Sequence, residues 1–265
     1  MALIAFTAGK GSPGCTTTAL AFALTWRSQV VVAECDPAGG SVRAGFLRGQ
    51  LAADRGLVPL AVAELRGDRF AGDFWQHLVD LDPPHQRRLL LPGIAEPAQA
   101  GSLEPVWGRL AAFLYNLEAG EGLDVLADCG RLATGHPPAP VLYAADVVLV
   151  ALRPVLPSIS SAATTVRVLR GALAEFGNGA DTLGLCVIGK GPYTAGEISR
   201  ELYAPVLVEL PEDRRTAAAL TLGGSVRKSS PLLRAAARSE EHIRSVVAHG
   251  RLPRSLAALE VGRGN

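Results

Sequence analysis

Short apolar runs recur along the chain and alternate with longer segments that have helical periodicity. The runs predict strands at residues 3–7, 30–34, 89–91, 124–128, 147–152, 183–188 and 206–209. Most of them are apolar at consecutive positions, which is typical of strands covered on both faces of a parallel sheet. Between the strands, helices are predicted at 16–27, 57–66, 69–81, 102–117, 158–176, 195–202, 214–222 and 231–248.

This alternation predicts a doubly wound α/β fold, in which a mostly parallel sheet is flanked by helices. No repeat, low-complexity block or long linker divides the sequence, so a single domain over residues 1–265 is expected. The proline-rich stretches DLDPPHQ and RLATGHPPAPV are expected to be loops within it. Ligands of such sheets bind beyond the carboxyl ends of the strands. The loops after Thr7, Glu34, Asp128 and Ile188 are therefore the place to look for a site.

Composition and charge narrow the class of protein. Hydrophobic residues make up 48% of the 265 residues, enough for a large core, and the net charge of +1 gives no overall basic field for nucleic acid or an anionic membrane. No apolar run approaches the roughly 18 residues of a membrane span, and the N-terminal run is too short for a signal peptide. The four cysteines form no CxxC pair, so a protein of the reducing cytoplasm is expected.

The stretch TAGKGSPGCTTTALAFAL, residues 7–24, has the form of a phosphate-binding loop that runs into a helix. Gly9, Gly11 and Gly14 allow successive backbone N–H groups to turn toward an anion, and the helix N-terminus adds a favourable dipole. The hydroxyl of Thr16 is placed to bind Mg²⁺ beside the phosphates. The alternative interpretation is an ordinary glycine-rich turn between a strand and a helix.

The segment KGSPGCTT, residues 10–17, resembles the deviant Walker A motif KGGxGKTT of the ParA/MinD family of partitioning and positioning ATPases. Lys10 falls on the signature lysine of that family, which reaches across a dimer interface to the partner's nucleotide. Cys15 falls on the second lysine, which touches the β- and γ-phosphates. The resemblance implies a phosphate site that is formed by Gly9, Lys10, Gly11, Ser12, Pro13, Gly14, Cys15, Thr16 and Thr17.

Two later strand ends resemble further motifs of the family. In VVVAECDPAGG, Asp36 matches the second aspartate of a D-x-D motif that orients the attacking water and the metal shell, whereas Glu34 replaces the first. In LDVLADCGRL, Asp128 matches the Walker B aspartate that is linked to Mg²⁺. The resemblance thus implies catalytic roles for Lys10, Asp36 and Asp128, and a Mg²⁺ site of Thr16, Asp36 and Asp128.

The base site is less similar to the family. The loop LPEDRR resembles the segment that borders adenine, with Pro211, Glu212 and Asp213 as its rim. Gly189 and Lys190 stand after the preceding strand, where the family often has an asparagine. The order of the motifs covers nearly the whole chain and implies the MinD-like fold of the SIMIBI class of P-loop NTPases.

Taken with the residues, the resemblance implies a homodimeric switch that binds ATP or ADP with Mg²⁺ and positions or partitions a partner protein complex. A neutral thiol in place of a lysine ammonium costs on the order of 10²–10³ in rate, so ATP hydrolysis is expected to be weak or absent. Eroded motifs of this kind also occur in pilus- and secretion-associated relatives of the CpaE/TadZ type. The expected location is the cytoplasm, with peripheral membrane association only through a partner.

Three alternatives stay open from the sequence. One is a catalytically dead pseudo-ATPase that acts as a scaffold for a pilus, secretion or cell-division assembly. Another is a thiol-based metal or redox protein, because Cys15, Cys35 and Cys129 all fall at the carboxyl edge of the sheet and the related nitrogenase iron protein binds a cluster with cysteines. The third is nonspecific DNA contact through the late basic residues Arg214, Arg215, Arg227, Lys228, Arg234 and Arg238.

Overall fold

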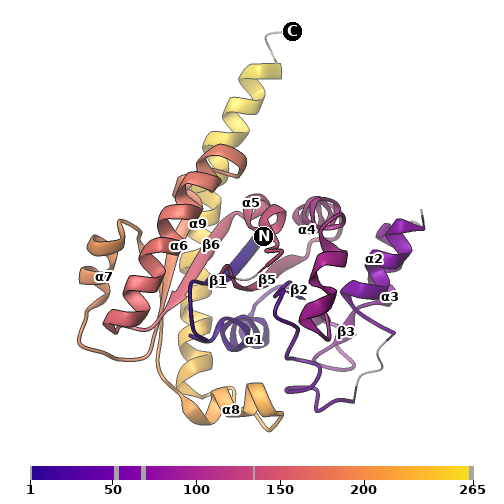
Figure 1. The fold of residues 1–265 in the computed structure, drawn as a ribbon, viewed down its shortest axis with the longest axis horizontal. Coiled ribbons are helices and arrows are strands. Elements are labelled where there is room, and N and C mark those ends of the chain that lie inside the picture. Colours follow the sequence, from indigo (N-terminus) through magenta and orange to yellow (C-terminus); the bar gives the residue numbers. More distant parts are fainter. Residues whose placement is uncertain (1, 51–53, 67–69, 134, 263–265) are drawn as a thin grey trace.

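An eight-stranded sheet runs through the middle of the molecule (Figure 1). The computed structural model describes residues 2–50, 54–66, 70–133 and 135–262. The strand order is β3-β4-β2-β5-β1-β6-β7-β8, and every neighbouring pair is parallel except β3 and β4. The bounds are β1 Leu3–Ala8, β2 Val30–Glu34, β3 Val79–Asp80, β4 Arg88–Leu91, β5 Asp124–Arg131, β6 Val147–Leu152, β7 Leu183–Ile188 and β8 Val206–Leu210. The predicted doubly wound, mostly parallel sheet is confirmed.

Helices cover both faces of the sheet. Their bounds are α1 Cys15–Thr25, α2 Leu57–Leu65, α3 Phe70–Gln76, α4 Trp107–Glu121, α5 Ala139–Ala144, α6 Leu156–Phe176, α7 Ala195–Leu202, α8 Arg214–Leu222 and α9 Pro231–Gly262, with 3₁₀ helices at Pro97–Leu103 and Ala180–Thr182. Helices α1, α8 and α9 bury their apolar residues in the core on one face, and α2 to α7 do so on the other. Within the described ranges no helix is long and apolar enough to cross a membrane.

Strand burial explains the unbroken apolar runs of the sequence. Along β2, Val31 points into one core and Val30 and Val32 point into the other, because successive side chains of a strand alternate between its faces. Since helices cover both faces, each of these positions must be apolar. The central strands β1, β2 and β6 are buried at every residue.

Three expected elements differ from the structure. The predicted helix at 69–81 ends at Gln76, and Val79–Asp80 form the short antiparallel strand β3 beside β4; Arg69 lies outside the described residues. The stretch RLATGHPPAPV, which was expected to be a loop, contains the start of α5, because prolines are tolerated in the first turn of a helix. The predicted helix at 102–117 is present as α4 but begins at Trp107, and the 3₁₀ helix Pro97–Leu103 covers the start of the predicted range.

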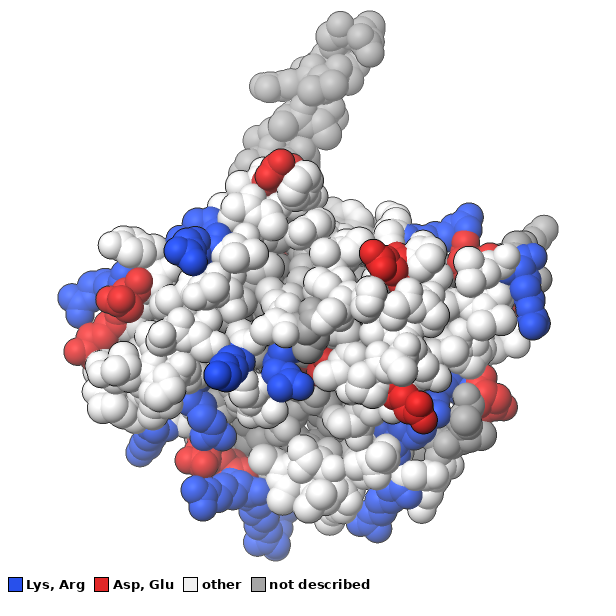
Figure 2. Space-filling model, viewed as in Figure 1, with Lys and Arg blue, Asp and Glu red and all other residues white. Residues whose placement is uncertain are grey.

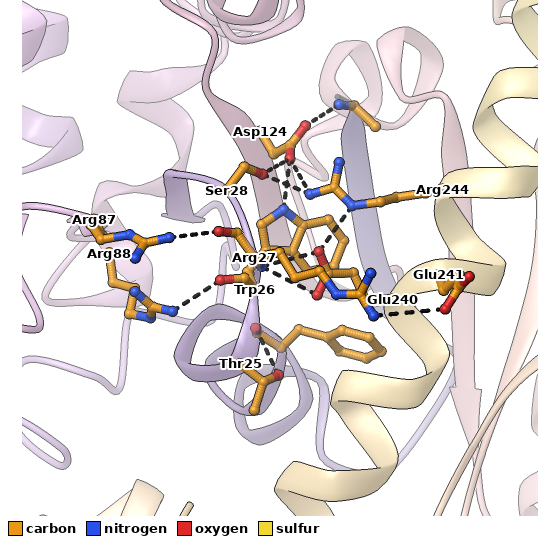
Figure 3. A network of polar contacts seen from close by, with 12 residues as sticks. Thr25, Trp26, Arg27, Ser28, Arg87, Arg88, Asp124, Glu240, Glu241 and Arg244 are labelled. Atoms are coloured by element: carbon orange, nitrogen blue, oxygen red, sulfur yellow. Dashed lines mark hydrogen bonds and ion pairs between the residues drawn. The ribbon is translucent and has the colours of Figure 1, made fainter.

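Helix α9 is tied to the amino edge of the sheet by a buried polar network (Figure 3). Asp124, the first residue of β5, accepts hydrogen bonds from Trp26 Nε1 at 2.7 Å, Ser28 Oγ at 2.6 Å, Arg244 Nη2 at 2.9 Å and the backbone amide of Ala2. The Arg244 guanidinium also lies 5.0 Å from the centre of the Trp26 ring. One carboxylate therefore joins α9, β5 and the segment after α1.

A second anchor, formed by Arg251, lies about two turns further along α9 than Arg244. Arg251 donates to both carboxylate oxygens of Asp146, at 2.8 and 2.7 Å, and Asp146 also accepts the backbone amide of Leu3. Asp146 immediately precedes β6 and is buried. The two anchors fix α9 across the amino ends of the central strands, at the edge opposite the candidate site.

Candidate functional site

The loop between β1 and α1 presents exposed backbone at the carboxyl edge of the sheet. Gly11 and Gly14 have φ values of 79° and 117°, a region that residues with a side chain seldom adopt. Helix α1 begins at Cys15, and no side chain caps its N-terminus. Because the first N–H groups of a helix have no partner within the helix, they remain available to an anion beside this loop.

A threonine and an aspartate meet at the base of this loop. The Thr16 hydroxyl donates a hydrogen bond to Asp128 Oδ2, and the amide of Gly130 donates to Oδ1 at 3.1 Å. Burial raises the pKa of Asp128 to about 7; the hydrogen bond from Thr16 opposes this shift, and the charges of Asp36 and Glu34 add to it. The two hydrogen bonds to the Asp128 carboxyl group thus do not offset the effect of its burial. One of them comes from the hydroxyl that is predicted to bind Mg²⁺.

Asp36 lies beside the segment that follows Asp128. Its Oδ1 accepts the amide of Ala38 at 2.8 Å, and a Cβ added at Gly130 would collide with its carboxylate. Partial burial raises the pKa of Asp36, while the bond from Ala38 and the charge of Arg131 lower it. The three residues predicted to form the metal site, Thr16, Asp36 and Asp128, therefore gather at the ends of neighbouring elements.

Glu34 has a different role from the aspartate that it replaces in the family motif. Its side chain is buried, and its two oxygens accept the amides of Val42 at 2.9 Å and Gly93 at 3.1 Å. Burial raises the pKa of Glu34, and the backbone amides that it accepts lower it. Glu34 therefore holds the loops after β2 and β4 together, and its carboxylate is directed at backbone.

Cys15 stands at the start of α1 with its side chain in the apolar core. It is 8% exposed and packs in the same core as the apolar residues of α1, α8 and α9. Burial raises the pKa of the thiol well above its usual range, and the charge of Asp128 raises it further. The side chain at the position of the phosphate lysine is thus neutral and withdrawn from the loop surface.

The cysteines do not form a common thiol site. All four are buried and free. Cys15 and Cys186 pack in one core, whereas Cys35 and Cys129 pack in the core on the opposite face of the sheet. Among the residues that the structure describes, no group of three or more His, Cys, Asp or Glu side chains could hold a metal ion. The convergence of Cys15, Cys35 and Cys129 that the alternative of a thiol-based metal or redox protein requires is therefore not found among the described residues.

A cavity of about 180 Å³ joins the glycine-rich loop to the loop after β8. Its wall on one side comes from Ser12, Pro13, Gly14 and Thr17, and on the other from Pro211, Glu212 and Asp213. The predicted phosphate residues and the predicted base rim thus face each other. The Asp213 carboxylate is engaged in capping α8, since it accepts the amide and hydroxyl of Thr216 at 3.0 and 2.7 Å.

Lys10 lies outside that cavity. It is exposed, and together with Gly9 and Arg131 it lines an adjoining hollow of about 780 Å³ beside α6. It also lines a hollow of about 340 Å³ with Gly11, Ser12 and Pro13. An exposed lysine on the outer side of the loop is suited to contact a second molecule more than the cavity of its own chain.

Sequence reasoning missed Arg153, which lines both the 180 Å³ cavity and the 340 Å³ hollow. Arg153 directly follows Leu152, the last residue of β6, so the rule that ligands bind beyond strand ends pointed to it. The loop after β6 lies in a segment that resembles the family, but the resemblance assigned no role to Arg153.

Surface charge at this side of the molecule is mixed. Figure 2 shows acidic and basic side chains interspersed, with basic groups along the lower edge, where α8 lies in Figure 1. The basic residues that the sequence singled out for DNA contact are all exposed: Arg214, Arg215, Arg227, Lys228, Arg234 and Arg238. Contact with DNA stays a prediction.

Comparison with known proteins identifies the fold. The sequence matches no family model and no curated protein. Among solved structures, a ParA family ATPase from Chlorobium tepidum superposes with a TM-score of 0.70 at 18% identity, over 90% of this chain and 98% of the other. The protein has the ParA/MinD fold. A MinD from Pyrococcus horikoshii in complex with Mg-ADP gives a TM-score of 0.68 at 17% identity, over 93% of this chain and 97% of that one.

A third structure with the ParA/MinD fold is a complex of MinD with MinC from Aquifex aeolicus. It gives a TM-score of 0.65 at 16% identity, and the match covers 91% of this chain and 95% of the other. The fold that the sequence motifs implied is therefore confirmed over nearly the whole chain.

Proposed function

We propose that this protein is a divergent member of the ParA/MinD family that binds ATP or ADP with Mg²⁺ and hydrolyses ATP slowly or not at all. The observation that carries the proposal is the contact between the Thr16 hydroxyl and Asp128, placed directly behind an uncapped helix N-terminus and a loop with left-handed glycines. An ordinary strand-to-helix turn has no need of a buried carboxyl group at this point.

The residues present fit a magnesium nucleotide. Mg²⁺ prefers oxygen ligands, and the Thr16 hydroxyl and the Asp128 carboxylate would hold it directly or through water. The backbone amides of residues 11–16 would hold the phosphates. When bound, Mg²⁺ would offset part of the phosphate charge. The MinD from Pyrococcus horikoshii, which has the same fold, is itself an Mg-ADP complex.

Slow turnover follows from the position of Cys15. A lysine there would place a permanent positive charge where charge develops during phosphoryl transfer, and a buried neutral thiol places none. Ground-state binding depends more on backbone amides and Mg²⁺, so it is affected less. Lys10 lies on the glycine-rich loop, and we assign it the contact with the second subunit. Asp36 lies near Asp128, and we assign it the orientation of the attacking water.

At the level of the whole protein we propose a single-domain homodimeric switch that positions or partitions a partner complex in the cytoplasm. Exposed Lys10 beside a wide hollow is suited to contact a second copy. A MinD of the same fold is found in complex with MinC, which supports partner binding in general. Membrane association would come through such a partner.

A second candidate is a pseudo-ATPase scaffold for a pilus, secretion or cell-division assembly. The observation that favours it is Glu34, whose carboxylate is committed to the amides of Val42 and Gly93. Cys15 and Glu34 thus occupy two positions at which the family motifs carry catalytic residues, and both side chains are buried in this protein. The scaffold differs from the switch in that nucleotide binding does not alter its assembly.

The test measures ATP and ADP binding by calorimetry, with phosphate release and sedimentation alongside, for the wild type, Cys15→Lys and the control Cys15→Ala. We expect the wild type and Cys15→Ala to bind nucleotide with little turnover, and Cys15→Lys to gain hydrolysis. Dimerisation should require ATP. If the wild type binds neither nucleotide at millimolar concentration with Mg²⁺, the proposal fails, and assembly that ignores nucleotide would favour the scaffold.

A further inference from the structure

Arg153, at the carboxyl end of β6, lines the candidate nucleotide cavity. Arg153 lines the 180 Å³ cavity and also the 340 Å³ hollow, and both of these border Ser12 and Pro13 of the glycine-rich loop. Within the described ranges it is the basic residue common to both. The resemblance to the ParA/MinD family assigns no role to this position.

The backbone of Arg153 is held firmly. Its amide donates to Ser158 Oγ at 2.9 Å, and its carbonyl accepts the amide of Val155 at 2.8 Å, which closes a tight turn between β6 and α6. The loop after β7 packs against this turn so closely that a Cβ at Gly191 would collide with the Pro154 carbonyl. The base of the side chain is therefore fixed in front of the cavity.

The guanidinium group, in contrast, is only loosely engaged. The side chain is 45% exposed, and Nη1 lies 3.6 Å from Glu212 Oε1, beyond the distance of a good hydrogen bond. Glu212 also pairs with Arg214, whose Nε lies 3.3 Å from the same oxygen. A half-exposed ion pair of this length contributes little, so the guanidinium is free to turn to a stronger anion.

The other basic residues near the loop are less well placed. Lys10 is absent from the lining of the 180 Å³ cavity. Arg214 does line it, but its side chain is 87% exposed, against 45% for Arg153. Arg131 lies on the far side, in the hollow beside α6, where its charge acts on Asp36. Among the described basic residues near the loop, Arg153 combines a place in the lining of this cavity with a half-buried side chain and a hydrogen-bonded backbone turn.

We propose that Arg153 is the side chain that binds the nucleotide phosphates in this protein, and that it supplies from the facing wall the positive charge that Cys15 does not. This inference rests on the proposed nucleotide function. The planar fork of an arginine matches two phosphate oxygens at once. Arg153 lines the cavity, whereas Cys15 does not. Arg153 therefore supplies a positive charge for binding the phosphates, but this charge does not lie at the position of the family's phosphate lysine. Slow hydrolysis is consistent with that difference.

The test is calorimetric titration of Mg-ADP into the full chain as wild type, Arg153→Ala and Arg153→Lys, with Arg167→Ala as an exposed arginine control on α6. A charge-assisted hydrogen bond lost from a phosphate weakens binding on the order of tenfold to a hundredfold, and we expect this loss for Arg153→Ala. Arg153→Lys should keep part of the affinity, and Arg167→Ala all of it. The wild type should also lose more affinity than Arg153→Ala when salt is raised.

A double variant separates direct binding from an indirect effect of Glu212. If Arg153 merely neutralised that carboxylate, Arg153→Ala with Glu212→Gln would recover wild-type affinity, and this outcome would overturn the inference. Equal affinities of the wild type and Arg153→Ala would also overturn it, while leaving the proposed function intact. No binding by the wild type would remove the proposed function and this inference with it. Circular dichroism and thermal unfolding of each variant exclude misfolding as the cause of a loss.

Discussion

Strand β5 carries two buried aspartates in opposite circumstances, Asp124 at its amino end and Asp128 toward its carboxyl end. At the amino end, Asp124 accepts hydrogen bonds from the amide of Ala2 and from three side chains, those of Trp26, Ser28 and Arg244 (Figure 3). At the carboxyl end, Asp128 accepts one hydroxyl and one backbone amide, and burial raises its pKa to about 7. The two residues are four apart on one strand, and Asp124 is paired with an arginine. Among the residues that the structure describes, no cation forms an ion pair with Asp128.

The difference distinguishes a carboxylate that stabilises the fold from one that is available to bind a ligand. A buried carboxylate with an arginine partner and several donors ties secondary elements together, and its loss leaves those donors unpaired. A buried carboxylate without a cation is unfavourable in the free protein, and it becomes favourable only when a cation arrives. The amino edge is therefore stabilising as it stands, whereas the carboxyl edge is suited to bind Mg²⁺.

The largest effect on stability is expected from Asp124→Ala. The change removes the acceptor that Trp26, Ser28 and Arg244 share, so buried donors lose their partner while Arg244 keeps its ion pair with Glu240. The free energy of unfolding should therefore fall by about 3–5 kcal/mol. Urea unfolding measures this change. Mg-ADP affinity well below the transition should stay unchanged. A loss of less than about 1 kcal/mol would show that the network is not what anchors α9.

In the absence of ligand, Asp128→Asn is expected to raise the free energy of unfolding, whereas Asp124→Ala lowers it. The native state keeps the Asp128 proton up to about pH 7, whereas the unfolded chain releases it near its ordinary pKa of 3.8, so wild-type stability falls as pH rises between these values. Asparagine does not ionise, and the variant should exceed the wild type by about 2–4 kcal/mol at pH 8. Below pH 4 the two should agree. Unfolding curves at pH 4, 6 and 8 measure this, and a variant that is less stable than the wild type at pH 8 would refute the contrast.

The smallest effect concerns ligand affinity as a function of pH. Mg²⁺ requires the ionised form of Asp128, so wild-type affinity for Mg-ADP should rise with pH up to about 7 and then level off. We expect binding at pH 6 to be about tenfold weaker than at pH 8. Asp128→Asn is the matched control, since only the titration of the nucleotide itself remains in it. The same pH slope in both proteins would mean that Asp128 takes no part in binding.

Sequence patterns predicted the sheet well because its strands are buried on both faces. Seven strands, including Val30–Glu34 and Val147–Leu152, appear where continuous apolar runs occur. Strand β3 was missed, since two residues pair with β4 only through tertiary contact, and one of them is the polar Asp80. Helix α5 was hidden by the prolines of its first turn. The local sequence pattern cannot predict an element that forms only through contacts with residues far along the chain.

The candidate site was predicted in part. Lys10, Thr16 and Asp128 could be placed from strand ends and from the loop motif, since these depend on chain order. Nothing local to Glu34 shows that its partners are the amides of Val42 and Gly93. Arg153 enters the site because the ends of three strands and the glycine-rich loop meet around one cavity. Such contacts arise only when the sheet is assembled.

The central claim is that the carboxyl edge still binds nucleotide although Cys15 has replaced the phosphate lysine. A crystal structure of the wild-type protein grown with Mg-ADP at pH 8 tests it most directly. The account predicts the diphosphate on the backbone amides of residues 11–16, Mg²⁺ beside Thr16 and Asp128, and the Arg153 guanidinium turned from Glu212 to a phosphate oxygen. An empty loop at millimolar Mg-ADP, or nucleotide bound elsewhere on the molecule, would contradict it.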